Sequence, residues 1–181
     1  MIEINFDIDG VKKEITLPSD YEEMTVGQYM ALNAIDFKDK TEIEIIVETI
    51  SLFGDISVDE VYMIPVQQFN EIVEAFKYTN DAIDKKDIDS IKVGDDVYYL
   101  KSDFTSLNLG ETISIDMIMK SEKNVNKSIS KLLCVFLRKK RSDGNLEEFN
   151  NSFMSREDDF KDIIITEVYQ LMSFFLTLKQ K

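Results

Sequence analysis

The sequence predicts a predominantly helical α+β protein, built as two tandem repeats that are each a β-hairpin followed by about three helices. Three observations lead to this prediction: two stretches of alternating apolar residues around tight turns, apolar residues at helical spacing after each, and a likeness between the halves. The chain has 181 residues, 44% of them hydrophobic, with six glycines and two prolines. A chain of this size buries about 70% of its unfolded surface, so we expect a folded core.

The first repeat is placed at residues 1–80 and opens with a hairpin. Apolar and polar residues alternate over 2–8, which is typical of a half-buried strand. Asp9 and Gly10 then supply the positive φ angles of a tight hairpin turn. The second strand is expected at residues 11–17.

Two helices are expected next in the first repeat. A capping box formed by Thr25 and Gln28 predicts a helix from about Val26 to Ile35. Apolar residues recur at helical spacing from Ile43 to Phe53, which predicts the second helix. Gly54 stands where a left-handed residue would close that helix.

A short turn and a third helix complete the first repeat. Ser57 begins another capping box, and Pro65 interrupts the turn that follows. We expect Tyr62 and Met63 to pack beneath this bend. The apolar stripe from Phe69 to Phe76 predicts the third helix.

Residues 81–90 are polar and weakly periodic, so we place a linker there and the second repeat at 91–181. A smaller hairpin is expected around Gly94, and a capping box that starts at Asn108 begins the helices. One helical face is formed by Val125, Ile129, Leu132, Leu133 and Phe136. After a turn at 142–145, Ser155 is expected to cap a final helix buried through Phe160, Ile163, Ile164, Val168, Leu171, Met172 and Phe175.

The two halves align without a gap at an offset of 83 residues, between 15–28 and 98–111. This alignment favours an internal duplication over chance or a shared capping pattern. Glycine disfavours helix formation, so its presence in both first turns indicates close packing against each hairpin. The identical pairs are Leu17 with Leu100, Ser19 with Ser102, Asp20 with Asp103, and Gly27 with Gly110.

The residue types indicate a protein that is not an enzyme. Histidine is absent and Cys134 is the single cysteine, which excludes Ser-His and Cys-His catalysis and intramolecular disulfides. Glycine-rich phosphate-binding loops are absent too. We predict no catalytic residue, metal or cofactor, and a buried, inert thiol at Cys134. A carboxylate-dependent, metal-assisted hydrolase remains the alternative of another class, and a rise in melting temperature with Mg²⁺, Mn²⁺ or Ca²⁺ would indicate it.

One segment stands out by its charge. The chain carries a formal charge of −14, yet residues 120–141 hold eight basic residues and one acid, +7 against −21 for the remainder. Three interpretations fit this basic segment: a solvated helix face, contact with DNA, or docking onto an acidic protein surface, including that of another copy of this chain. Because the acidic remainder of the chain would repel the phosphate backbone of DNA, a protein partner is favoured over DNA. The candidate partner-binding residues are Lys123, Lys127 and Lys131, expected on one helical face, with Arg138, Lys139, Lys140 and Arg141.

The order of features resembles small tail-assembly and virion-associated proteins of tailed bacteriophages. The residues that carry the resemblance are the hairpin at 2–17, the phrase MTVGQYMAL at 24–32, ISLFG at 50–54 and ISVDEV at 56–61. The second half, with LNLGE at 107–111 and KLLCVFLR at 131–138, looks like structural-region proteins of crAss-like gut phages.

The resemblance implies a non-catalytic virion protein, either internal cargo or a component of the portal and tail. The alternative within the family is a tail-assembly chaperone that leaves before the particle is complete. The implied partners are other phage structural proteins and further copies of the chain. Nucleic acid would be met only through residues 120–141, and no membrane contact is expected. The implied location is the virion, and the cytoplasm of the bacterial host during assembly.

Overall fold

The structure, a computed structural model, describes residues 1–8, 10–84, 86, 88–101, 107–122, 124–169 and 171. The chain divides into two compact units, and each is described by itself. Unit 1 comprises residues 1–24 and 31–83, and unit 2 comprises residues 25–30 and those from 84 onward. The predicted mixture of helices and antiparallel strands is confirmed, with one two-stranded and one three-stranded sheet among the described residues.

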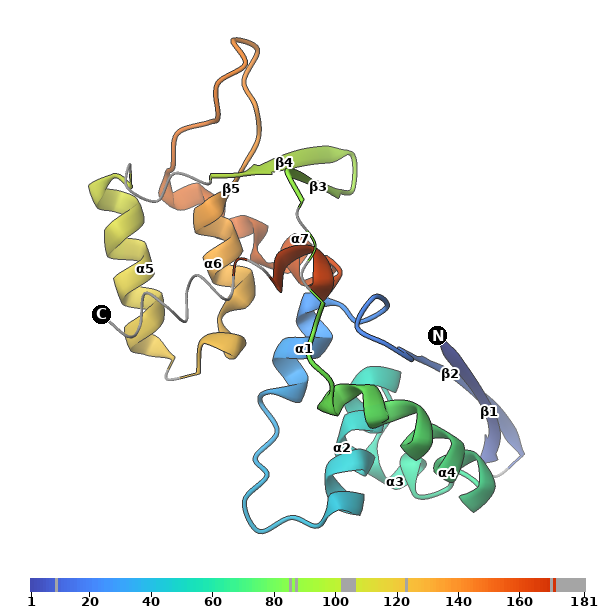
Figure 1. Ribbon diagram of the computed structural model, residues 1–181. Helices are drawn as coiled ribbons and strands as arrows, with labels where there is room; N and C mark the ends of the chain where they lie inside the picture. Colours follow the sequence, from blue (N-terminus) through green and yellow to red (C-terminus); the bar gives the residue numbers. More distant parts are fainter. Residues whose placement is uncertain are drawn as a thin grey trace. The chain divides into compact units, whose positions relative to one another are not determined.

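Unit 1 begins with the predicted hairpin. β1 (Ile2–Ile8) and β2 (Val11–Leu17) pair antiparallel with Ile8 opposite Val11, and Gly10 takes a φ of +84° at the turn. Asp9 lies outside the described residues. The helical elements that follow are α2 (Glu42–Gly54), α3 (Val58–Val61), α4 (Val66–Ala75) and the short 3₁₀ helix η1 (Phe76–Asn80), all visible in Figure 1.

The core of unit 1 joins the inner face of the hairpin to its helices. Removing these side chains from water stabilises the unit by roughly 25 cal/mol per Å² of apolar surface. The capping boxes at Thr41 and Ser57 fix where α2 and α3 begin. The buried set is Ile4, Phe6, Ile15, Leu17, Val47, Ile50, Phe53, Val61, Ile64, Ile72 and Phe76.

The predicted end of α2 was wrong by one residue. Gly54 is the last helical residue, and Asp55 is the left-handed one, with a φ of 49°. Gly54 instead allows α2 to pack closely against β2, because a Cβ at this position would lie 3.3 Å from Cδ1 of Ile15. The apolar stripe of α2 is also shorter than predicted, since Ile43 is exposed.

Tyr62 and Met63 do not pack beneath the bend, and this prediction was wrong. The Ser57 capping box sets the rotation of α3 so that Val61 and Ile64 point into the core. Tyr62 and Met63 lie between those two positions and are exposed. The sequence pattern could not distinguish the two pairs, since all four residues are large and apolar.

Unit 2 contains α1 (Val26–Leu32) as far as Met30, and its Thr25–Gln28 capping box forms as predicted. Figure 1 shows α5 and α6 side by side. The other elements are β3 (Ser90–Val93), β4 (Asp96–Leu100), α5 (Leu109–Ser121), η3 (Val125–Lys127), α6 (Ile129–Phe136), β5 (Leu137–Arg138), η4 (Asn151–Arg156) and α7 (Glu157–Lys161).

A third strand, β5, was not predicted. It pairs antiparallel with β4, with Tyr99 opposite Arg138 and Leu100 opposite Leu137. The chain therefore changes from helix to strand directly after Phe136. Because this pairing joins residues 37 and 39 positions apart, local periodicity gave no sign of it.

The final helix is not continuous, contrary to the prediction. α7 ends at Lys161, and Ile164 then forms an isolated β-bridge with Thr25. The amide of Val26 donates to the carbonyl of Ile163 at 2.7 Å, so residues 163–164 pair with 25–26 and interrupt the helix, which resumes over 165–169. Ser155 does not cap α7, since its hydroxyl donates to the carbonyl of Ser152. The predicted burial of Met172 and Phe175 lies outside the described residues.

Two tandem repeats are not confirmed. Gly27 and Gly110 both stand in the first turn of a helix, but the atoms nearest to a Cβ at either position do not belong to a hairpin strand. A Cβ on Gly27 would meet Lys161, whereas one on Gly110 would meet Asn108 and Phe149. The aligned pairs that involve Ser102 and Asp103 lie outside the described residues.

Candidate functional site

The predicted basic face is not a single surface. Lys127 belongs to η3 and Lys131 to α6, with the non-helical residue Ser128 between them, so they do not share one helical face as predicted. Arg138 is 1% exposed and belongs to the interior, which corrects its placement on that face. Lys123 lies outside the described residues.

The remaining basic residues lie at the root and tip of a hairpin loop, residues 139–147. Lys139 pairs with Asp96, and Arg141 pairs with Asp143 at 3.2 Å. The ammonium of Lys140 lies 3.8 Å from the ring centroid of Tyr99. Their positive charges are therefore largely engaged within unit 2.

Arg138 instead forms the centre of a buried charge network. Its Nη2 donates to Oε1 of Glu111 at 2.9 Å, and its Nη1 donates to the carbonyls of Cys134 and Leu137. Both Arg138 and Glu111 are 1% exposed. Oε2 of Glu111 accepts from Nζ of Lys101 at 2.7 Å. The network joins the first turn of α5 to β5 and to Lys101, the residue that follows β4.

The same carboxylate completes the helix cap of α5. The amide of Asn108 donates to Glu111, and the Asn108 side chain accepts from the Glu111 amide at 2.9 Å. Burial alone would raise the pKa of Glu111. Hydrogen bonds from Lys101, Asn108 and Arg138 outweigh that effect and hold the pKa below its ordinary value.

This lowered pKa predicts how Glu111 contributes to stability as pH changes. The unfolded carboxyl binds a proton more readily than the folded one, so its contribution is fully present above about pH 4.3 and declines as pH falls through the folded pKa. The stability difference between wild type and Glu111→Gln should therefore be large at pH 7 and shrink toward pH 3. Urea unfolding followed by circular dichroism measures it. A constant difference over this range would contradict the assignment.

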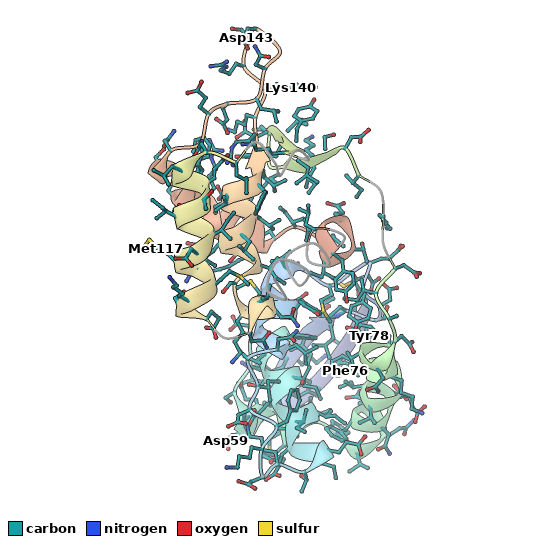
Figure 2. All side chains as sticks on the ribbon, turned by 60° about the vertical axis from the view of Figure 1, so that its left-hand side comes forward. Asp59, Phe76, Tyr78, Met117, Lys140 and Asp143 are labelled. Carbon is teal, nitrogen blue, oxygen red and sulfur yellow. The ribbon has the colours of Figure 1, made fainter. Side chains whose placement is uncertain are left out.

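Anchored in this way, α5 presents an apolar stripe to solvent. Leu109, Ile113 and Met117, here called the α5 stripe, are 75%, 49% and 64% exposed. Residues four apart lie above one another on a helix, so the stripe runs about 12 Å along one face. Figure 2 shows Met117 pointing away from α6. The opposite face contributes Ile118 to the core.

Sequence reasoning missed the α5 stripe. The signal was present, because apolar residues recur every fourth position from 109 to 117 in addition to Ile115, Ile118 and Met119. A helix that is apolar on opposite faces is normally buried on both. The described residues bury Ile118 on one of those faces and leave Leu109, Ile113 and Met117 exposed on the other.

The hairpin loop 139–147 extends from the sheet (Figures 1 and 2). Lys140 bridges to Leu146, and the amide of Arg141 donates to the carbonyl of Asn145 at 2.8 Å. At its base, Arg156 pairs with Glu147 and stacks on Phe153, 4.0 Å from the ring centroid. These contacts hold the loop at a defined position in unit 2.

Cys134 is buried, as predicted. Burial raises the pKa of its thiol to about 12, with the nearby Glu157 carboxylate acting in the same direction. The thiol therefore stays protonated and shielded in the folded protein. We expect a thiol-specific reagent at pH 8 to react with it only after denaturant is added. Rapid reaction of the native protein would contradict this geometry.

Acidic side chains gather beside an open depression of about 480 Å³ between the β3–β4 turn and α7. Lys92 and Tyr98 also line it. Within the described part of the chain, no group of three or more acidic or cysteine side chains is arranged to hold a metal ion. The acidic residues lining it are Asp95, Asp96, Asp159 and Asp162.

Comparison with protein-family sequence models, curated proteins and solved structures finds no match to this chain. Among the helices that the structure describes, none combines the length and apolar character needed to cross a membrane.

Proposed function

We propose that this protein is a non-catalytic structural component of a tailed-bacteriophage virion, carried as internal cargo or built into the portal and tail. It binds another virion protein through the α5 stripe of unit 2. The observation that carries the proposal is the exposure of three large apolar side chains in line on a helix that a buried charge network fixes in place.

The energetics of the α5 stripe favour a protein partner. Full burial of a leucine, isoleucine or methionine side chain contributes about 1.5–3 kcal/mol, and the three stripe residues are between 49% and 75% exposed. Covering all three would add stability on the order of a few kcal/mol. Exposed apolar surface of this kind marks interaction sites in proteins.

The phage assignment has a different support, namely the resemblance of the feature order to virion-associated and tail-assembly proteins. A protein-binding surface is expected both of a virion component and of a tail-assembly chaperone. A tail-assembly chaperone absent from the mature particle is therefore the second candidate. The two roles differ in one measurable property, which is presence in finished particles.

Quantitative mass spectrometry of gradient-purified particles tests the proposal. The phage whose genome carries this sequence is grown with wild-type protein or with Ile113→Lys/Met117→Lys. We expect a fixed number of wild-type copies per particle and at least tenfold fewer copies of the variant.

Val97→Lys is the matched control, since Val97 is 42% exposed in β4 of the same unit. It should enter particles as wild type does. Wild-type protein confined to assembly intermediates would identify a chaperone and refute the virion role. Equal incorporation of the stripe variant would refute the role of α5.

A further inference from the structure

Unit 1 carries a second apolar surface, formed where α3 turns into α4. Val58, Tyr62, Met63 and Val66 are 38%, 61%, 53% and 76% exposed. We call these four residues the corner patch. Pro65, between Met63 and Val66, is exposed as well.

The local fold holds the corner patch outward. The Ser57 capping box sets the rotation of α3, and Tyr62 stands one turn after Val58, with its amide donating to the Val58 carbonyl at 3.2 Å. Pro65 is the N-cap of α4, which makes Val66 the first helical residue. Burial of Val61 and Ile64 between these positions leaves the patch facing solvent.

The unit that carries the corner patch is strongly negative. Unit 1 holds 18 acidic residues and five lysines, a formal charge of −13, whereas unit 2 holds 17 acidic and 16 basic residues, a charge of −1. Three of the five lysines pair with glutamates inside unit 1. One of these pairs joins Lys13 of β2 to Glu60 of α3 at 3.0 Å. Asp59 also lies in α3 and is exposed (Figure 2).

A partner of the corner patch has to match both its apolar side chains and the negative charge of unit 1. An apolar segment without charge would gain no electrostatic attraction, and an acidic one would be repelled. A basic segment without an apolar face would leave the patch in water. Nucleic acid and anionic membranes carry the wrong charge for this unit.

We propose that the corner patch binds a basic amphipathic segment of another protein, with apolar side chains against Tyr62, Met63 and Val66 and lysines or arginines facing the acids of unit 1. The site lies in unit 1 and does not depend on the α5 stripe. Its test is a binding measurement with purified protein, so its outcome is separate from that of the virion proposal.

Peptide binding to the full chain tests this proposal. The probe is a labelled 14-residue peptide of leucine and lysine with all leucines on one helical face, followed by fluorescence anisotropy. Two further peptides are its scrambled sequence and the same pattern with glutamate in place of lysine. We expect both to bind at least tenfold more weakly than the probe, and the probe to weaken as salt increases.

Two variants locate the binding surface. Tyr62→Ser/Val66→Ser should lose at least tenfold in affinity for the probe. Phe37→Ser/Ile43→Ser removes two apolar residues elsewhere in unit 1 that are 53% and 60% exposed, and its affinity should stay within twofold of wild type. Thermal melts establish that both variants fold.

Three outcomes would overturn the proposal. Equal loss in both variants, or in neither, would mean that the corner patch is not the binding surface. Equal binding of the scrambled peptide would mean that acidity alone attracts it. Binding of the glutamate peptide as tightly as the probe would remove the charge argument.

Discussion

Arg138→Ala should lower the free energy of unfolding of unit 2 by about 3–5 kcal/mol, one of the two largest effects we expect. Removing the guanidinium leaves the Glu111 carboxylate buried, with Lys101 and the Asn108 amide as its remaining hydrogen-bond donors. The two backbone carbonyls that Arg138 satisfies would also lose their donor. Removing one partner of a buried ion pair lowers the free energy of unfolding by far more than the intact pair contributes to it, because the other charge stays buried without its partner.

Hydrogen–deuterium exchange of peptides from α5 and α6 measures this loss, with peptides from α2 as an internal reference. Arg141→Ala is the matched control, because the Arg141–Asp143 pair is exposed and should contribute less than about 1 kcal/mol. Arg138→Met/Glu111→Leu should recover much of the stability by removing both charges. Unchanged exchange in Arg138→Ala would show that the network is not a structural anchor.

Phe160→Ala is the second substitution expected to have a large effect, about 3–5 kcal/mol. Phe160 is fully buried in α7 and meets the ring of Tyr98 edge to face, with centroids 5.0 Å apart. The substitution opens a cavity between α7 and the three-stranded sheet and removes an aromatic pair.

Exchange of peptides from α7 and β4 should rise sharply in this variant. Phe37→Ala deletes the same side chain at a position that is 53% exposed, and it should change stability by less than about 0.5 kcal/mol. Similar effects of the two substitutions would contradict the packing of Phe160 described above.

Local patterns predicted local structure well. The alternation over residues 2–17 predicted both strands of the first hairpin, and the capping boxes at Ser57 and Asn108 predicted the first residues of α3 and α5. These features depend on neighbours within a few positions. The thiol of Cys134 was predicted to be buried because its neighbours Leu133 and Phe136 are apolar, and it is buried.

Features that depend on distant partners were not predictable in the same way. Arg138 looked like part of a basic surface because its charged neighbours, Lys139 to Arg141, follow it directly. Its burial depends on Glu111, 27 residues earlier in the chain. The α5 stripe was missed for a related reason, since an apolar helix face is assumed to be covered until the structure shows otherwise.

Crosslinking from position 117 within purified particles tests the central claim most directly. Met117 is replaced by a benzophenone amino acid, and particles are irradiated and analysed by mass spectrometry, with the same replacement of Val97 as control. We predict a covalent product with one other virion protein from position 117 and at least tenfold less from position 97. Particles that contain the chain but yield no product from position 117, or equal products from both positions, would contradict a partner-binding role for α5.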